Sequence, residues 1–239
     1  MDSPVERSWV PLTAHERRVL GVLVEKAKTT PEYYPLTIAA IVTGSNQKSN
    51  RDPITNFDAD DVEDILQGLR KKGAVVMVEA GGRVVRWKHT LYDWLKVGKV
   101  ELAVVAELLL RGAQSVGDLR ARASRMEPLP DLAALQAVLD SLAAKDLVVT
   151  LTPPGIRRGV VVTHNLGRPD DLARERAKYA NVVDAPDEPD RPARPAPRAE
   201  ASAAPSAELA ALRSEVDALR EAVRRLSDEV QELKSALGS

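Results

Sequence analysis

Apolar side chains recur every three or four residues from residue 13 onward, which is the spacing of an amphipathic helix. The opening run Thr13-Ala14-His15-Glu16 forms a capping box, in which the threonine hydroxyl accepts from the Glu16 N–H and the glutamate reaches back. The segment TTPEYYP ends this first helix, and a short second helix is predicted from Leu36 to about Gly44. The polar segment SNQKSNRDPITN that follows predicts a loop.

A third helix and a hairpin complete this first unit. Asp58 is the expected N-cap of the third helix, and Gly73 is its expected stop. The run VVMVEAGGRVVRW places two β-branched stretches around Gly81-Gly82, which predicts a hairpin. A last helical turn is expected from Leu91 to about Leu95. This order of elements is typical of a winged helix-turn-helix domain.

The same order of elements then repeats. Lys99 to Arg111 predicts an apolar helix, Ser115 opens a short one, and Asp131 caps a third. The stretches LVVTL and VVVTH flank the turn PPGIRRG and predict a second wing. Leu69 and Leu142 hold matching places in the two third helices, 73 residues apart. This regularity favours a structural duplication over two unrelated α+β pieces.

The predicted fold is mainly α with small β-hairpin wings (α+β), and its two tandem winged helix-turn-helix domains are joined to a coiled-coil helix. The first domain is placed at 11–97, behind a disordered tail at 1–10, and the second at 98–168. Residues 169–206 are assigned to a connecting segment and a Pro/Ala-rich disordered linker, because no large apolar side chain occurs between residues 184 and 206. The coiled coil is placed at 207–239.

The C-terminal helix carries a strict heptad of leucine and valine. Its members, the predicted dimerisation residues, are Leu209, Leu212, Val216, Leu219, Val223, Leu226, Val230, Leu233 and Leu237. Valine at a and leucine at d favour a parallel two-stranded coil, and glutamates at g face arginine or lysine at e of the partner helix. Two alternatives stay open: a trimer, because no polar a residue fixes the oligomeric state, and a single helix docked on the folded body.

Charge and composition exclude several classes of protein. The 34 Lys+Arg against 35 Asp+Glu give a formal net charge of −1, which excludes a histone-like protein that holds nucleic acid by bulk charge. The absence of Cys excludes disulfide scaffolds, thiolate-bound zinc and thiol catalysis. No signal peptide or apolar run of membrane-spanning length is found, so a cytoplasmic protein is expected.

The polar run NQKSNRDP is the most unusual segment, and it supplies four candidate contact residues: Gln47, Lys48, Asn50 and Arg51. Amides and cations gathered in one loop could contact phosphates or a protein partner. The alternative is a structural loop, in which Asn, Ser and Asp side chains satisfy their own backbone turns.

Further candidate contacts are cations at the end of the third helix, on the wings and on the second domain's short helix. They are Arg70, Lys71, Lys72, Arg83, Arg86, Lys88, Arg120, Arg122, Arg157 and Arg158. Arginines at a wing tip commonly contact phosphates or the minor groove, although solvated turns carry them as well. The acidic opening of the third helix, DADDVED, would repel phosphates.

Residues for catalysis are scarce. The three histidines are isolated, none has metal-ligand spacing, and each is expected on the surface or a wing. The run SNQK matches S-x-x-K of penicillin-binding enzymes, but the companion motifs are absent. We therefore expect a protein that is not an enzyme and that binds no metal or cofactor.

Several motifs of the chain resemble those of a known family. They are Glu25-Lys26, Thr29-Thr30-Pro31, Tyr34-Pro35-Leu36, the highly specific run Asn46 to Pro53, and the stretch from Leu108 to Met126. Over about residues 12–166 the chain resembles the YceH-like bacterial family, uncharacterised protein family 0502. This resemblance implies tandem winged-helix domains in a bacterial cytoplasm, and it implies no biochemical role.

The predicted function is that of a non-enzymatic, dimeric DNA-binding protein, and a protein–protein interaction adaptor is the alternative. The fold, the wing arginines, the polar loop and the predicted coil favour a dimeric DNA-binding protein, regulatory or chromosome-associated. The near-zero net charge and the acidic third helix favour a protein–protein interaction adaptor instead. The expected partners are a second copy of the chain and either duplex DNA or a protein, with no membrane.

Overall fold

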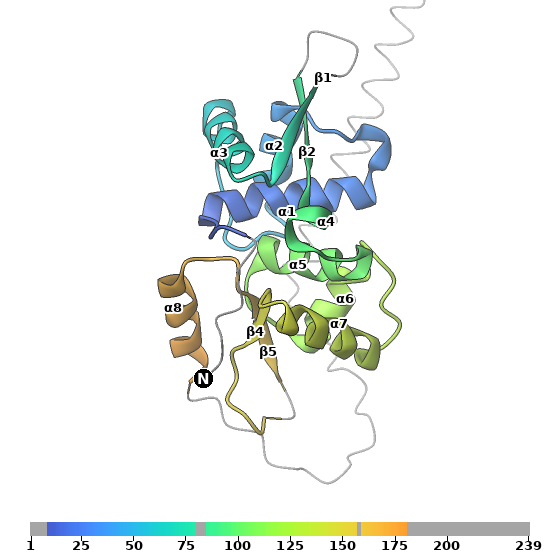
Figure 1. Ribbon diagram of the computed structural model, residues 1–239, viewed down its shortest axis with the longest axis vertical. Helices are drawn as coiled ribbons and strands as arrows, with labels where there is room; N and C mark the ends of the chain where they lie inside the picture. Colours follow the sequence, from blue (N-terminus) through green and yellow to red (C-terminus); the bar gives the residue numbers. More distant parts are fainter. Residues whose placement is uncertain (1–8, 80–84, 157–158, 181–239) are drawn as a thin grey trace, which may run out of the picture. The chain divides into compact units, whose positions relative to one another are not determined.

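The computed structural model describes residues 9–79, 85–156 and 159–180 (Figure 1). These residues are mainly helical, with two small antiparallel sheets. The elements of the first half are α1 (Ala14–Thr29), the 3-10 turn η1 (Pro31–Tyr33), α2 (Ile38–Ser45), α3 (Ala59–Lys71), β1 (Val75–Glu79), β2 (Val85–His89) and α4 (Leu91–Leu95). Those of the second half are α5 (Lys99–Arg111), β3 (Gln114–Ser115), α6 (Val116–Ala123), α7 (Leu132–Ala144), β4 (Val148–Thr150), β5 (Val161–His164) and α8 (Pro169–Tyr179).

The two halves repeat one another in detail. Helices α2 and α6 both have 8 residues, and α3 and α7 both have 13. The residue that follows each third helix by two positions is left-handed: Gly73 at φ 75° and Asp146 at φ 56°. Glycine and aspartate tolerate this conformation better than most residues, so the chain can reverse into the hairpin at both places. The duplication predicted from residue spacing is thus visible in the geometry.

The predicted helix starts are confirmed by their caps. Thr13 and Asp58 each take part in a full capping box, with Glu16 and Asp61 as the respective partners. The side chains of Ser115 and Asp131 accept from the backbone N–H three residues on. Local sequence therefore fixed these four boundaries.

The second helix of each half is preceded by a short strand-like pairing that the sequence analysis did not predict. Leu36, expected to start a helix, instead exchanges two backbone hydrogen bonds with Trp87 of β2, at 3.0 and 2.8 Å, and Thr37 caps α2. In the second half Gln114 pairs with Val162, so that sheet has three strands in the order β3-β5-β4. These pairings tie each second helix to the strand that returns from the hairpin.

A largely aliphatic core runs through both halves without a break. Its centre is the packing of α1 against α5, where a Cβ on Gly21 would lie only 2.8 Å from the Leu110 side chain. Trp9 belongs to this core at 5% exposure, although residues 1–10 were predicted as a disordered tail. The indole is large enough to gain by burial, so order begins ahead of the predicted boundary.

Helix α8 lies within the stretch that the sequence analysis assigned to a connecting segment. None of its residues is buried, and its sequence PDDLARERAKY lacks the apolar stripe on which helix prediction depends. An ion pair of 3.3 Å joins its Asp171 to Arg17 of α1. The predicted linker beyond residue 180, the coiled coil at 207–239 and the heptad Leu209 to Leu237 lie outside the described residues. No helix in the described part is long and apolar enough to cross a membrane.

Candidate functional site

The polar loop after α2 is folded against the body, and Arg51 points inward. Its side chain is fully buried, and its Nη2 lies 2.5 Å from Glu25 Oε2 of α1. Its Nε donates to the Gly44 carbonyl at 2.9 Å, which satisfies a carbonyl in the last turn of α2. The prediction of Arg51 as an exposed contact therefore needs correction, because a buried and paired guanidinium cannot reach a partner molecule.

The asparagines of the same loop also bond within the chain. Asn46 accepts from Phe57 N at 2.8 Å and donates to Phe57 O at 2.7 Å. Asn50 has φ 61°, and its side-chain oxygen accepts from Arg111. These contacts fit the alternative of a structural loop. Gln47 is half-buried, and Lys48 alone of the four predicted contacts is exposed.

Arg18 is a buried arginine that links three segments of the chain, a role that the sequence did not indicate. It is 3% exposed and donates to the carbonyls of Ser45, Pro53 and Leu110 at 3.2, 2.6 and 3.2 Å. Burial, followed by the positive charge of Arg51, lowers the pKa of Arg18 to about 10. One guanidinium thus joins the ends of α2 and α5 to the loop that follows α2, and no local pattern in the sequence signals this role.

At the end of α3 the three predicted cations differ in their surroundings. Lys72 forms an ion pair of 2.7 Å with Glu16 and donates to the Pro11 carbonyl at 2.9 Å. Arg70 and Lys71 are exposed, and neither side chain forms a hydrogen bond or an ion pair with the described residues. Only these two of the three are free to contact another molecule.

The cations of the hairpins and of α6 are mostly engaged as well. Arg86 donates to the Pro35 carbonyl at 2.9 Å, whereas Lys88 is exposed on β2. Arg120 donates to the carbonyls of Leu129 and Pro130, both at 3.2 Å, and Arg122 donates to Gln114 Oε1 at 2.7 Å. The remaining predicted contacts lie outside the described residues: Arg83, Arg157 and Arg158.

The exposed faces of the two third helices carry few cations. Along the first turns of α3 the exposed side chains are acidic: Asp60, Asp61, Glu63 and Asp64. On α7 they are small or uncharged over the first half of the helix, and Leu132 is 53% exposed there. Over these first turns both helices therefore present a neutral or negative surface.

A pair of histidines occupies matching positions at the ends of β2 and β5. The Nδ1 atom of His89 accepts from Leu91 N, and that of His164 accepts from Leu166 N, both at 3.3 Å. Burial, followed by the charge of Lys28, lowers the pKa of His89 to about 4. Burial, followed by the charge of Arg17, lowers the pKa of His164 to about 3. Both rings are therefore neutral at pH 7, and the proton sits on Nε2.

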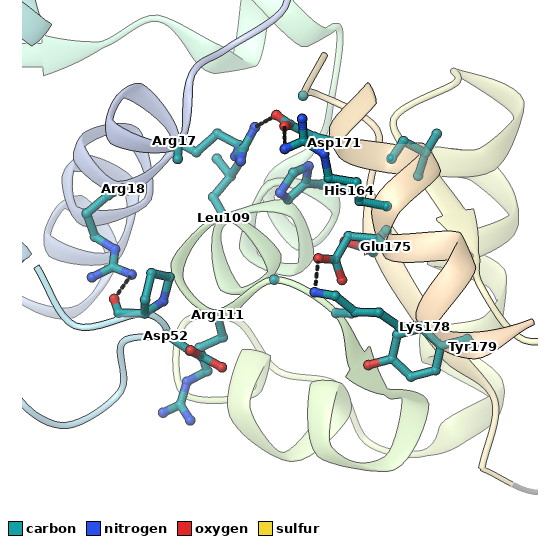
Figure 2. A pocket seen from close by; sticks show the side chains of 18 residues that line it. Arg17, Arg18, Asp52, Leu109, Arg111, His164, Asp171, Glu175, Lys178 and Tyr179 are labelled. Carbon is teal, nitrogen blue, oxygen red and sulfur yellow. Dashed lines mark hydrogen bonds and ion pairs between the residues drawn. The ribbon is translucent and has the colours of Figure 1, made fainter. Parts of the chain in front are cut away.

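The structure also contains a groove of about 540 Å³ that the sequence did not indicate (Figure 2). It lies between α1, the loop at residues 52–53, the end of α5, strand β5 and helix α8. Its lining includes the predicted surface histidine His164 and none of the predicted contact residues. The described residues hold no group of three or more His, Asp or Glu that could bind a metal ion.

Comparisons with known proteins place the chain in a family. The family model described as "Protein of unknown function, DUF480" matches residues 12–155. A UPF0502 protein of Rhodopirellula baltica is 51% identical over 161 residues, 67% of this chain and 67% of the relative. A UPF0502 protein of Geobacter sulfurreducens is 46% identical over 164 residues, covering 67% of this chain and 75% of the relative. A UPF0502 protein of Geotalea daltonii is 48% identical over 145 residues, and the match covers 61% of this chain and 66% of the relative. The chain thus belongs to the bacterial DUF480 family, uncharacterised protein family 0502, as its polar loop and flanking motifs indicated.

Proposed function

We propose that this chain is a non-enzymatic interaction protein, built from two winged-helix units, that binds a protein partner. The repeated order of three helices and an antiparallel hairpin supports the winged-helix assignment. Winged-helix folds serve both as nucleic-acid readers and as adaptor surfaces, so the fold alone does not choose between them. The choice rests on the chemistry of the exposed faces.

The observation that carries the proposal is the surface of the two third helices. In helix-turn-helix proteins the first turns of this helix enter the major groove between two rows of phosphates. Here α3 exposes Asp60, Glu63 and Asp64 in those turns, and α7 exposes Ala133 and Gln136. Carboxylates repel phosphates, alanine offers no hydrogen bond to a base, and the Gln136 amide already donates to Asp140 at 2.8 Å. A protein surface with basic or amide groups is the better match.

Duplex DNA is the second candidate, and a specific set of cations favours it. Arg70, Lys71 and Lys88 are exposed in the first unit. The arginines that the sequence places on the hairpin turns would add to them. Cations in these positions could hold the phosphate backbone and would make binding strongly salt-dependent.

A photo-cross-linking amino acid placed at Glu63 or at Gln136 tests the proposal in cells. Both side chains are exposed, so the change leaves the core intact. We expect discrete protein adducts from these positions that survive nuclease digestion, and none from the exposed control Asp93 on α4. Two results together would favour DNA instead: no protein adduct forms, and the chain binds duplex DNA in a salt-dependent way. The DNA binding should then be lost in the double variant Arg70→Gln with Lys71→Gln.

We further propose that two copies associate through a parallel coiled coil at residues 207–239. The support is the uninterrupted heptad and the opposite charges at g and e. Analytical ultracentrifugation should show a dimer for the full chain and a shift toward monomer for a chain ending at residue 183. Val223→Asp should act like the truncation, because it buries two like charges in the seam. One mass for all three proteins would refute the coil.

A further inference from the structure

The groove beside α8 combines an open cavity with an unusual concentration of cations. Its volume of about 540 Å³ is within the range of small-molecule sites, roughly 300–1,000 Å³. Five cationic side chains line it: Arg17, Arg18, Arg111, Arg174 and Lys178. Three carboxylates line it as well: Asp52, Asp171 and Glu175. The lining therefore has two more positive than negative groups.

The carboxylates of α8 neutralise only part of this charge. Asp171 lies 3.3 Å from Arg17 and 3.9 Å from Arg174, so it serves two cations at once. Glu175 pairs with Lys178 at 2.5 Å. In Figure 2 the Lys178 side chain extends from α8 across the groove, toward the side on which Arg111 lies. This long side chain can swing to a ligand, because its exposed ion pair contributes little stability.

The opposite wall holds positive charge that the protein leaves incompletely paired. The guanidinium of Arg18 is buried, and its Nε has no hydrogen-bond partner among the described residues. Burial, followed by the nearby positive charges of Arg122, Arg125 and Arg51, lowers the pKa of Arg111, whereas the charge of Glu107 raises it. Arg111 and Glu107 form an ion pair of 2.9 Å. Arg18 donates only to backbone carbonyls and forms no ion pair with the described residues, so its charge is the one on this wall that an entering anion would balance.

His164 adds a neutral donor to the same space. Its Nδ1 is occupied by the Leu166 N–H, so its Nε2 carries the proton and can donate. Figure 2 shows this ring beside Arg17 and Asp171 at one end of the groove. A neutral donor and several guanidinium and ammonium groups are the partners that oxyanions use in proteins.

We propose that this groove binds a small multivalent oxyanion, either a phosphate ester or a dicarboxylate. Its cationic walls would hold the anionic group, and Leu109, Leu172 and Tyr179 would face the remaining part of the ligand. No residue of α3 or α7 lines the groove, so anion binding there would be a separate function from partner binding. Its failure in the test below would leave the proposed partner binding untouched.

The full chain labelled in its three histidine rings tests the site by nuclear magnetic resonance. Inorganic phosphate and, separately, succinate are titrated at pH 7.5, with sodium chloride of equal ionic strength as the reference. We expect the His164 ring signal to shift saturably with at least one of the two anions. His89 is an internal control, because it holds the matching place in the first half and does not line the groove. Saturation by phosphate alone identifies a phosphate ester, and saturation by succinate alone identifies a dicarboxylate.

Substitutions on α8 supply the second arm of the experiment. The double change Arg174→Gln with Lys178→Gln should weaken binding about tenfold or more, because each removes a charged donor. Arg176→Gln is the matched control, since Arg176 is exposed on the same helix and does not line the groove. Lys178→Arg should retain binding. Equal shifts of all three histidines, a response that does not saturate, or unchanged affinity in the double variant would each overturn the proposal.

Discussion

Replacing Arg51 by methionine should lower the free energy of unfolding by about 3 kcal/mol, although the residue lies in a polar loop. The change leaves the Glu25 carboxylate, itself only 16% exposed, without its ion-pair partner. It also removes the donor that satisfies the Gly44 carbonyl in the last turn of α2. A buried group that loses its partner costs more than the bond itself contributed, because the remaining charge stays desolvated. Equilibrium urea unfolding followed by circular dichroism measures the difference.

Lys48→Met is the matched control for this experiment. Lys48 lies three residues earlier in the same loop and is exposed, so its replacement should change the stability by less than about 0.5 kcal/mol. The double variant Glu25→Met with Arg51→Met should cost less than the sum of the two single changes, because they break the same ion pair. Equal stability of the Arg51 and Lys48 variants would restore Arg51 as a candidate contact.

Acidification from pH 7 to 4.5 should destabilise the protein through His89 and His164, by about 2 kcal/mol for each ring. Their pKa values in the folded chain are lowered to about 4 and about 3, against an ordinary value of 6.5. A lowered pKa means that the unfolded chain binds these two protons first as the pH falls. The contribution of the two neutral rings to the free energy of unfolding is therefore complete above about pH 6.5. It is lost progressively toward pH 4, where the folded rings begin to accept protons.

Asparagine at both positions should flatten this part of the pH profile. Its side-chain oxygen can take the place of Nδ1 as acceptor for the backbone N–H two residues on, which preserves the turn. The carboxylates titrate in the same pH range in both proteins, so the difference between the two profiles isolates the histidines. A wild-type profile identical to that of the double variant would show that neither ring is buried in its neutral form.

Local chemistry explains why so much of the fold could be predicted. A capping box at Thr13, caps at Asp58, Ser115 and Asp131, and the spacing of apolar residues act within a few positions of the chain. These signals gave the helices, the hairpins and the repetition of the whole arrangement. They could not give α8, because a polar helix on the surface has no apolar stripe, and its place depends on contacts such as that of Asp171 with Arg17.

The predicted contact residues fall into two groups, those that are exposed and those that the fold engages. Lys48, Arg70, Lys71 and Lys88 are exposed as expected, whereas Arg51 is buried in the protein. Lys72, Arg86, Arg120 and Arg122 are partly buried and donate to groups of their own chain. Nothing in the sequence near a given arginine distinguishes these outcomes. The charge is the same, and the difference lies in which carbonyls and carboxylates the fold brings within reach.

The sequence by itself determined most of the helices, the two hairpins and their duplication, because caps, turns and apolar spacing are interactions between neighbours. Tertiary structure alone decided which cations are free and where the groove lies. Arg51 meets a carboxylate 26 residues away, and Arg18 meets a carbonyl 92 residues away. A guanidinium is stable both in water and in a ring of buried acceptors, so its residue type does not reveal its environment. Only the folded chain, by closing α8 over α1 and the end of α5, gathers the cations that make the proposed oxyanion site.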